Sequence, residues 1–260
     1  MKFAANLSMM FCEVEFPDRF QAAAEAGFAA VEYLFPYDWE PGLLAAKLKD
    51  NNLTQVLFNL PPGDWEAGER GTASLPGRER EFQESVAKAI SYARSLNLSR
   101  LHCMAGLRDP SVDSREQRDT YVQNLRHAGE QCRDNGIQLL IEPINPVDIP
   151  GYFLSDFGQA LEVISEVNGA GPTVLKLQFD IYHCQKIHAD VPGWLQRCRE
   201  HTAHLQIAGT PDRHEPDAGN LPLAEIMAHC EEIHPDLWIG CEYRPEAQTV
   251  AGLGWMTPYR

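Results

Sequence analysis

The sequence has few cysteines and no long apolar run. Its seven cysteines are scattered, and no two of them form a C-x-x-C pair. This argues against both a disulfide framework and a zinc knuckle. Near the start, Asn6, Ser8 and Glu13 interrupt the apolar residues, which argues against a signal peptide and a membrane span. We therefore expect reduced thiols in a cytoplasmic protein.

Positive charge is also scarce. The chain has 22 Lys and Arg against 37 Asp and Glu, a formal net charge of -15. Nucleic-acid binding needs a basic surface that displaces counterions, and anionic membranes attract basic segments. We therefore expect neither nucleic acid nor membrane as a partner. A small anionic substrate remains compatible, because a local arginine or a bound cation can reverse the local field. The sequence leaves homo-oligomerisation open.

Nucleotide-binding loops are missing as well. No G-x-G-x-x-G follows the first predicted strand and no P-loop occurs anywhere, so an open doubly wound nucleotide-binding sheet has little support. The chain shows no internal repeat, low-complexity tract or linker. Its 260 residues are enough for one domain with a large core. We expect a single domain over residues 1–260.

Strand-like and helix-like segments alternate along the chain. Eight short apolar runs predict strands at residues 3–8, 30–35, 54–59, 100–104, 138–142, 174–180, 204–208 and 238–242. The segments between them predict helices at 16–26, from 41, 79–96, 114–135, 156–167, 191–200 and 221–233, and the tail 251–260 is short for a closing helix. This alternation favours an α/β fold, a single (β/α)8 TIM barrel.

Four polar residues each stand at or near the end of one of these predicted strands: Glu142, Asp180, Gln206 and Glu242. The carboxyl ends of the strands meet on one face of such a barrel, which carries the chemistry. Three carboxylates and an amide there would be costly to bury unless they held a cation. Oxygen ligands of this kind suit Mg²⁺ or Mn²⁺. The pattern therefore predicts a metal-assisted enzyme.

Other residues could bind a substrate. His183 lies three residues after Asp180, and Arg213 lies just past the seventh predicted strand, where it could grip a substrate carboxylate with two hydrogen bonds. His102 lies inside the fourth predicted strand, and Arg70 lies in a Gly/Pro-rich stretch, residues 60–78, whose length is typical of active-site lids. Each also has a simpler interpretation, as a solvated arginine or a structural histidine.

Several segments together carry a family resemblance. They are residues 3–9 (FAANLSM), 35–37 (FPY), 59–65 (NLPPGDW), 67–71 (AGERG), 76–79 (PGRE), 141–145 (IEPIN), 180–183 (DIYH) and 240–243 (GCEY). On these matches, in this order, the chain resembles the hydroxypyruvate isomerase family, within the larger group of xylose-isomerase-like barrels. The resemblance extends nearly end to end.

The resemblance implies an aldose–ketose type isomerase. Glu142 and Glu242 match the expected acid/base pair, and the metal site of the wider group maps onto Glu142, Asp180, Gln206 and Glu242. The best-known reaction of the family interconverts hydroxypyruvate and tartronate semialdehyde, whereas a close group isomerises 2-oxo-tetronates, one carbon longer. Residues 141–151 look more like the first branch, and residues 206–216 look more like the second.

Three alternatives remain open on the sequence. A ketose 3-epimerase would use the same ligands and remove a proton from a different carbon. An apurinic-site endonuclease shares the barrel but uses a histidine-rich zinc cluster, against which stand the acidic charge and Gln206. A sugar-acid binding protein would bind the ligand without proton exchange.

Overall fold

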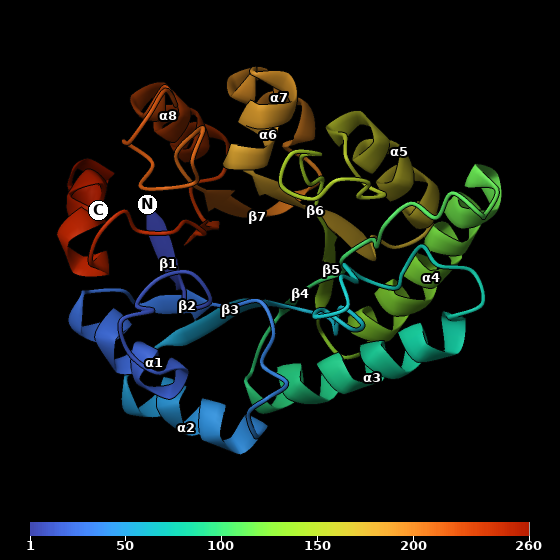
Figure 1. Ribbon diagram of the computed structural model, residues 1–260, viewed down its shortest axis with the longest axis horizontal. Helices are drawn as coiled ribbons and strands as arrows, with labels where there is room; N and C mark the ends of the chain where they lie inside the picture. Colours follow the sequence, from blue (N-terminus) through green and yellow to red (C-terminus); the bar gives the residue numbers. More distant parts are fainter. Residues whose placement is uncertain (260) are drawn as a thin grey trace. The chain divides into compact units, whose positions relative to one another are not determined.

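The computed structural model describes residues 1–259 and contains eight parallel strands that alternate with helices (Figure 1). The strands pair in chain order as a closed barrel, so the predicted (β/α)8 barrel is confirmed. Their bounds are β1 Lys2–Asn6, β2 Ala30–Glu32, β3 Thr54–Asn59, β4 Arg100–His102, β5 Gln138–Ile141, β6 Leu175–Asp180, β7 Thr202–Ile207 and β8 Trp238–Cys241. Each overlaps a strand predicted from the sequence.

The helices also follow the predicted pattern, with one addition. They are α1 Phe16–Glu25, α2 Pro41–Asp50, α3 Glu79–Ser95, α4 Ser114–Asp134, α5 Phe157–Asn168, α6 Ile181–His188, α7 Val191–Cys198, α8 Leu223–Ile233 and the 3-10 helix η1 Thr249–Tyr259. The addition is α6, which is not among the predicted helices. It begins where β6 ends, because Asp180 is the last residue of β6 and also caps α6 by accepting a hydrogen bond from the Tyr182 backbone N–H. The last residue of the predicted tail, Arg260, lies outside the described residues.

The chain divides into two compact units, residues 1–56 with 179–260 and residues 57–178. In the first unit β1 pairs with both β2 and β8, with Asn6 opposite Glu32 and Ala5 opposite Cys241. Strand β7 pairs with β8, with Gln206 opposite Gly240. Polar side chains at the carboxyl ends of neighbouring strands in this unit are thereby brought to the same level.

In the second unit β4 pairs with β3 and β5, so that His102 is opposite both Asn59 and Leu140. Helix α4 packs between α3 and α5 (Figure 1). Residues 60–78 contain no helix or strand. The backbone N–H of Ser74 donates to Ala105 O and the side chain of Asn124 donates to Ala73 O, at 2.9 Å each. This stretch is therefore fastened to the helices and strands of its own unit.

The strands are buried on both faces, as parallel barrel strands must be. Leu205, Gln206 and Ile207 in β7 are each at most 1% exposed. Six of the seven cysteines are buried, and Cys12 is exposed. Among residues 1–259 no helix combines the length and the apolar character that a membrane crossing requires.

Candidate functional site

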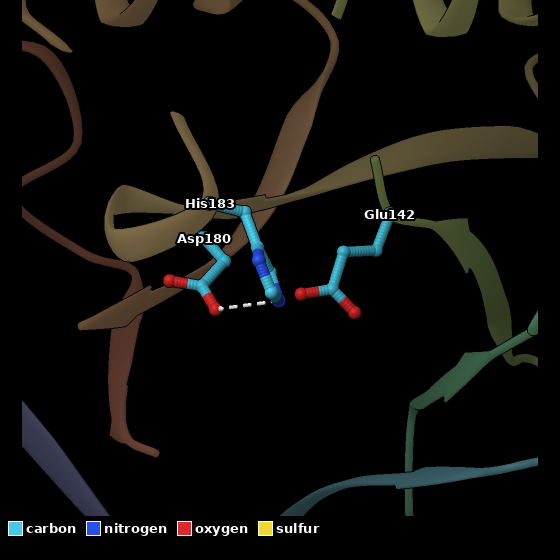
Figure 2. Close-up of side chains that lie close together, drawn as sticks. All are labelled: Glu142, Asp180 and His183. Atoms are coloured by element: carbon cyan, nitrogen blue, oxygen red, sulfur yellow. Dashed lines mark ion pairs between the residues drawn. The ribbon is translucent and has the colours of Figure 1, made fainter. Parts of the chain in front are cut away.

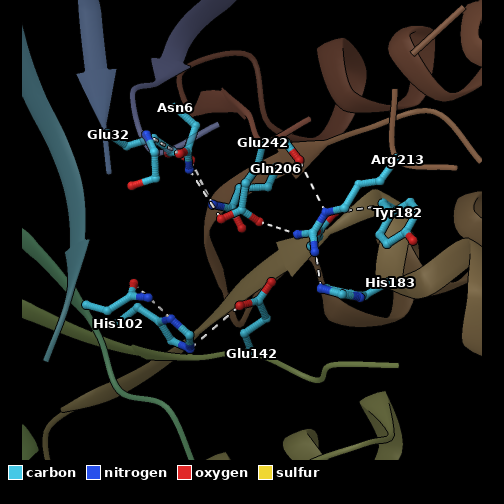
Figure 3. Close-up of polar contacts among 12 residues, drawn as sticks. Asn6, Glu32, His102, Glu142, Tyr182, His183, Gln206, Arg213 and Glu242 are labelled. Atoms are coloured by element: carbon cyan, nitrogen blue, oxygen red, sulfur yellow. Dashed lines mark hydrogen bonds and ion pairs between the residues drawn. The ribbon is translucent and has the colours of Figure 1, made fainter. Parts of the chain in front are cut away.

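Glu242 is a carboxyl group of the first unit whose pKa is raised by its surroundings. It directly follows β8 and is 4% exposed. Its Oε2 accepts a 2.6 Å hydrogen bond from Arg213 Nη2, and its Oε1 accepts one of 3.2 Å from Asn6 Nδ2 (Figure 3). Burial raises the pKa of Glu242 to about 8, with Arg213 opposing the shift and the charges of Asp180 and Glu32 adding to it. Without a cation, burial therefore favours the protonated form of this carboxyl group.

Arg213 lies among acidic side chains in the structure. Its Nη2 atom is 2.6 Å from Glu242 Oε2 and 3.6 Å from Asp180 Oδ2. Its guanidinium also lies 4.9 Å from the centroid of the Tyr182 ring (Figure 3). The side chain is 14% exposed. Arg213 is thus not the solvated loop arginine of the alternative interpretation, and it can both neutralise these carboxylates and meet an anion.

Asp180 and His183 are brought together by the start of α6. Oδ1 of Asp180 accepts from the Tyr182 backbone N–H at 2.8 Å, and Oδ2 lies 3.6 Å from His183 Nε2 (Figure 2). Both side chains are at most 2% exposed. The three-residue spacing places them on one side of the first helical turn. A carboxylate and an imidazole nitrogen are therefore available at one point of the first unit.

Glu142 directly follows β5 in the second unit and is 4% exposed. Its Oε2 lies 3.7 Å from His102 Nε2 (Figure 3). His102 Nδ1 lies 3.1 Å from Asn59 Oδ1. His102 is buried as well. Neighbouring strands thus present a chain of three polar side chains, Asn59, His102 and Glu142. In this chain one ring nitrogen of His102 faces the glutamate and the other faces Asn59.

Arg70 has contacts inside its own loop. Its guanidinium lies 3.8 Å from the centroid of the Trp65 ring, and Nη1 donates to Trp65 O at 3.1 Å and to Glu69 O at 2.6 Å. Glu69 in turn pairs with Arg78, and that hydrogen bond lowers the pKa of Glu69. These contacts give Arg70 a role in shaping residues 60–78.

Glu32, Asn6 and His204 of the first unit were missed as site residues from the sequence. Together with Gln206 and Glu242 they form one hydrogen-bonded cluster, the acidic group. Glu32 is fully buried at the end of β2, and its Oε1 accepts from Asn6 Nδ2 at 3.0 Å and from Gln206 Nε2 at 2.7 Å (Figure 3). Its Oε2 lies 2.6 Å from His204 Nε2. The signal was present, since Glu32, like Glu142, is a charged residue in an apolar strand-like run.

The donor atoms fit a hard divalent cation. Asp180 and His183 of the first unit each offer one buried ligand atom to a metal ion, and Glu142 of the second unit offers a buried carboxylate oxygen (Figure 2). Gln206 and Glu242 add further oxygens at the ends of β7 and β8. Buried carboxylates without a counter-ion are costly, and carboxylate-rich sites favour Mg²⁺ or Mn²⁺.

A closed (β/α)8 barrel with buried carboxylates directly after its strands is the architecture of a barrel enzyme. The xylose isomerase-like TIM barrel family matches residues 20–259, and the chain belongs to this family. The resemblance to hydroxypyruvate and 2-oxo-tetronate isomerases is confirmed by curated relatives 38–50% identical along their full length. The chain is accordingly an isomerase.

Two curated relatives illustrate this similarity. The 2-oxo-tetronate isomerase of Cupriavidus necator is 50% identical, over 99% of this chain and 98% of its own. The hydroxypyruvate isomerase of Escherichia coli is 44% identical over 100% of both chains.

Solved structures agree on the fold. A Brucella melitensis protein named AP endonuclease, family 2 has a TM-score of 0.96 and 44% identity, over 100% of this chain and 99% of its own. D-psicose 3-epimerase of Clostridium cellulolyticum has a TM-score of 0.77 over 100% of this chain and 90% of its own. At 15% identity the epimerase shows a shared fold alone.

Proposed function

We propose that this isomerase acts on short 2-oxo-3-hydroxy acids and moves a proton between C3 and C2 through an enediolate. Hydroxypyruvate, which would give tartronate semialdehyde, is the three-carbon candidate. A 2-oxo-tetronate is the four-carbon candidate, favoured by the relative at 50% identity. The observation that carries the proposal is the pair of buried glutamates directly after β5 and β8, Glu142 and Glu242.

The two glutamates are suited to acid/base work because their surroundings differ. Glu242 is bound by Arg213 and Asn6, and its pKa is raised to about 8 by burial. Glu142 faces His102 instead. One glutamate removes the proton from the substrate carbon, and it or its partner returns a proton to the adjacent carbon.

A divalent metal, Mg²⁺ or Mn²⁺, would be held by Glu142, Asp180, Gln206 and Glu242. When bound it supplies a positive charge that stabilises the developing enediolate oxygens. The buried oxygen donors support this assignment.

The substrate carboxylate needs a cationic partner. Arg213 is the best placed, since its guanidinium already binds one carboxylate of the acidic group. His183 and His102 would orient the carbonyl and hydroxyl oxygens of the substrate. Arg70 would act from residues 60–78 as a further anion ligand.

The rival functions predict different products. A ketose 3-epimerase would invert one carbon of a sugar without making an aldehyde. An endonuclease would have to bind DNA despite a net charge of -15. The deciding experiment supplies hydroxypyruvate and a 2-oxo-tetronate, each with Mn²⁺, and identifies the products by NMR. Isomerisation of either acid supports the proposal, and turnover of neither refutes it.

A further inference from the structure

Glu32 is a buried carboxylate that the proposed chemistry does not use. It is 0% exposed, and its hydrogen-bond partners include Asn6, His204 and Gln206. Asn6, Gln206 and Glu32 appear together beside Glu242 in Figure 3. A buried charge of this kind is retained at a cost, so its effect on its neighbours is of interest.

The first effect is on the carboxamide of Gln206. A carboxylate accepts hydrogen bonds and cannot donate them. The group of Gln206 that faces Glu32 is therefore its NH2 group, at 2.7 Å from Oε1. The amide oxygen then lies at the opposite end of the carboxamide, which is the end a cation needs. A glutamine at position 32, which can both donate and accept, would allow either orientation of the Gln206 carboxamide.

The second effect passes through Asn6. Its Nδ2 atom donates to Glu32 Oε1 at 3.0 Å and to Glu242 Oε1 at 3.2 Å, while its Oδ1 accepts from the Ser8 backbone N–H at 3.1 Å. All three contacts agree on one orientation of the amide. Asn6 therefore links the position of Glu242 to that of Glu32.

Glu32 is itself fixed from two sides. His204 is 0% exposed, and its Nδ1 is buried with no hydrogen-bond partner among the described residues, so the hydrogen bond of its ring is the one with Glu32. On the other side lies Gly240, where an added Cβ would collide with both carboxylate oxygens of Glu32. The room left by Gly240 and the hydrogen bond to His204 therefore both favour the same position of the Glu32 carboxylate.

We propose that Glu32, held by His204, is a positioning residue that turns Gln206 and, through Asn6, Glu242 toward the cation. The inference rests on the metal site of the proposed function and deepens it. Partners that orient metal ligands without touching the metal typically change affinity 10- to 100-fold when removed.

The test is the affinity of the substrate-free protein for Mn²⁺, measured by electron paramagnetic resonance. Glu32→Gln should weaken binding by about 10- to 100-fold. The control Glu13→Gln removes another carboxylate, one that accepts from Thr249, and should leave the affinity unchanged. The double variant Glu32→Gln/Gln206→Glu should recover much of the affinity. Both ends of the new side chain at position 206 are oxygens, and the amide at position 32 can donate to it.

The outcomes separate the two hypotheses. If wild-type protein binds Mn²⁺ and folded Glu32→Gln binds it equally well, the positioning role is wrong and the metal site stands. If Glu32→Gln loses thermal stability but keeps its affinity for Mn²⁺, the positioning role is also wrong, because Glu32 would then have a purely structural role. If wild-type protein binds no Mn²⁺, the metal site itself is wrong and this inference falls with it. Should Glu32→Gln fail to fold, Glu32→Asp keeps the charge with a shorter reach, and an unchanged affinity in that variant would count against the proposal.

Discussion

Arg213 and Glu242 form a close pair, with 2.6 Å between Nη2 and Oε2. The pair joins the segment after β7 to the end of β8, and the backbone supports it because the Arg244 N–H donates to Arg213 O at 2.9 Å. Burial favours the protonated form of Glu242, whereas Arg213 favours the ionised form. The protonation of this glutamate is thus a balance between the two.

Removing the guanidinium should shift this balance. In Arg213→Met, which keeps a long side chain without charge, we expect the pKa of Glu242 to rise above about 8 in the metal-free protein, because burial would act without its largest opponent. NMR titration of ¹³C-labelled glutamate carboxyl groups would measure the pKa of Glu242. The signal that disappears in Glu242→Gln identifies the resonance of this residue. Arg244→Met removes an exposed arginine two residues along the chain from Glu242 and should leave the pKa in place. An unchanged pKa in Arg213→Met would contradict this account.

Glu242 should also make the stability of the metal-free protein depend on pH. Its pKa is about 8 in the folded chain against an ordinary 4.5, so between these values the folded state binds more protons than the unfolded state. The stabilisation is complete below about pH 4.5 and is lost as the pH rises through about 8.

Urea unfolding of wild type and Glu242→Gln in EDTA, from pH 5 to pH 9, would test this linkage. The variant cannot ionise at position 242. Its stability relative to wild type should therefore increase with pH across that range. A difference that stays constant with pH would mean that Glu242 keeps an ordinary pKa.

Gly240 should tolerate no side chain. A Cβ there would meet the Glu32 carboxylate, so Gly240→Ala should lower the free energy of unfolding by roughly 1–3 kcal/mol, the usual range for overpacking a core. Gly42, in the first turn of α2, has nothing within 4 Å of an added Cβ. Gly42→Ala should be neutral or stabilising by up to about 1 kcal/mol. Thermal or urea unfolding of both variants measures the contrast, and equal effects would contradict it.

The alternation of apolar runs was enough to predict the barrel, because each parallel strand is buried on both faces and each helix on one. The alternation does not set where a strand ends: the strand predicted over residues 30–35 is shorter in the structure, Ala30–Glu32. Helix α6 was missed because it starts directly after a strand and is only eight residues long.

The site shows where sequence reasoning stops. Polar residues that end apolar runs could be picked out singly, since burial without a partner would be costly. The hydrogen-bond partners of these residues could not be predicted, because pairs such as Glu32 and His204 are separated by 172 residues in the sequence. Arg213 was expected near a substrate, but the sequence did not predict its ion pair with Glu242, nor its positive φ of 61°. Such contacts are set by tertiary structure.

The most direct test follows hydroxypyruvate and a 2-oxo-tetronate by NMR with wild-type protein, first with Mn²⁺ and then with EDTA. The comparison includes Glu142→Gln, Glu242→Gln and the exposed control Glu162→Gln. We predict isomerisation of at least one acid by wild type and by the control, its loss in EDTA, and a fall in kcat of roughly 10²-fold or more in each glutamate variant. Turnover of neither acid by folded wild type, or near-normal turnover in either Glu142→Gln or Glu242→Gln, would contradict the account.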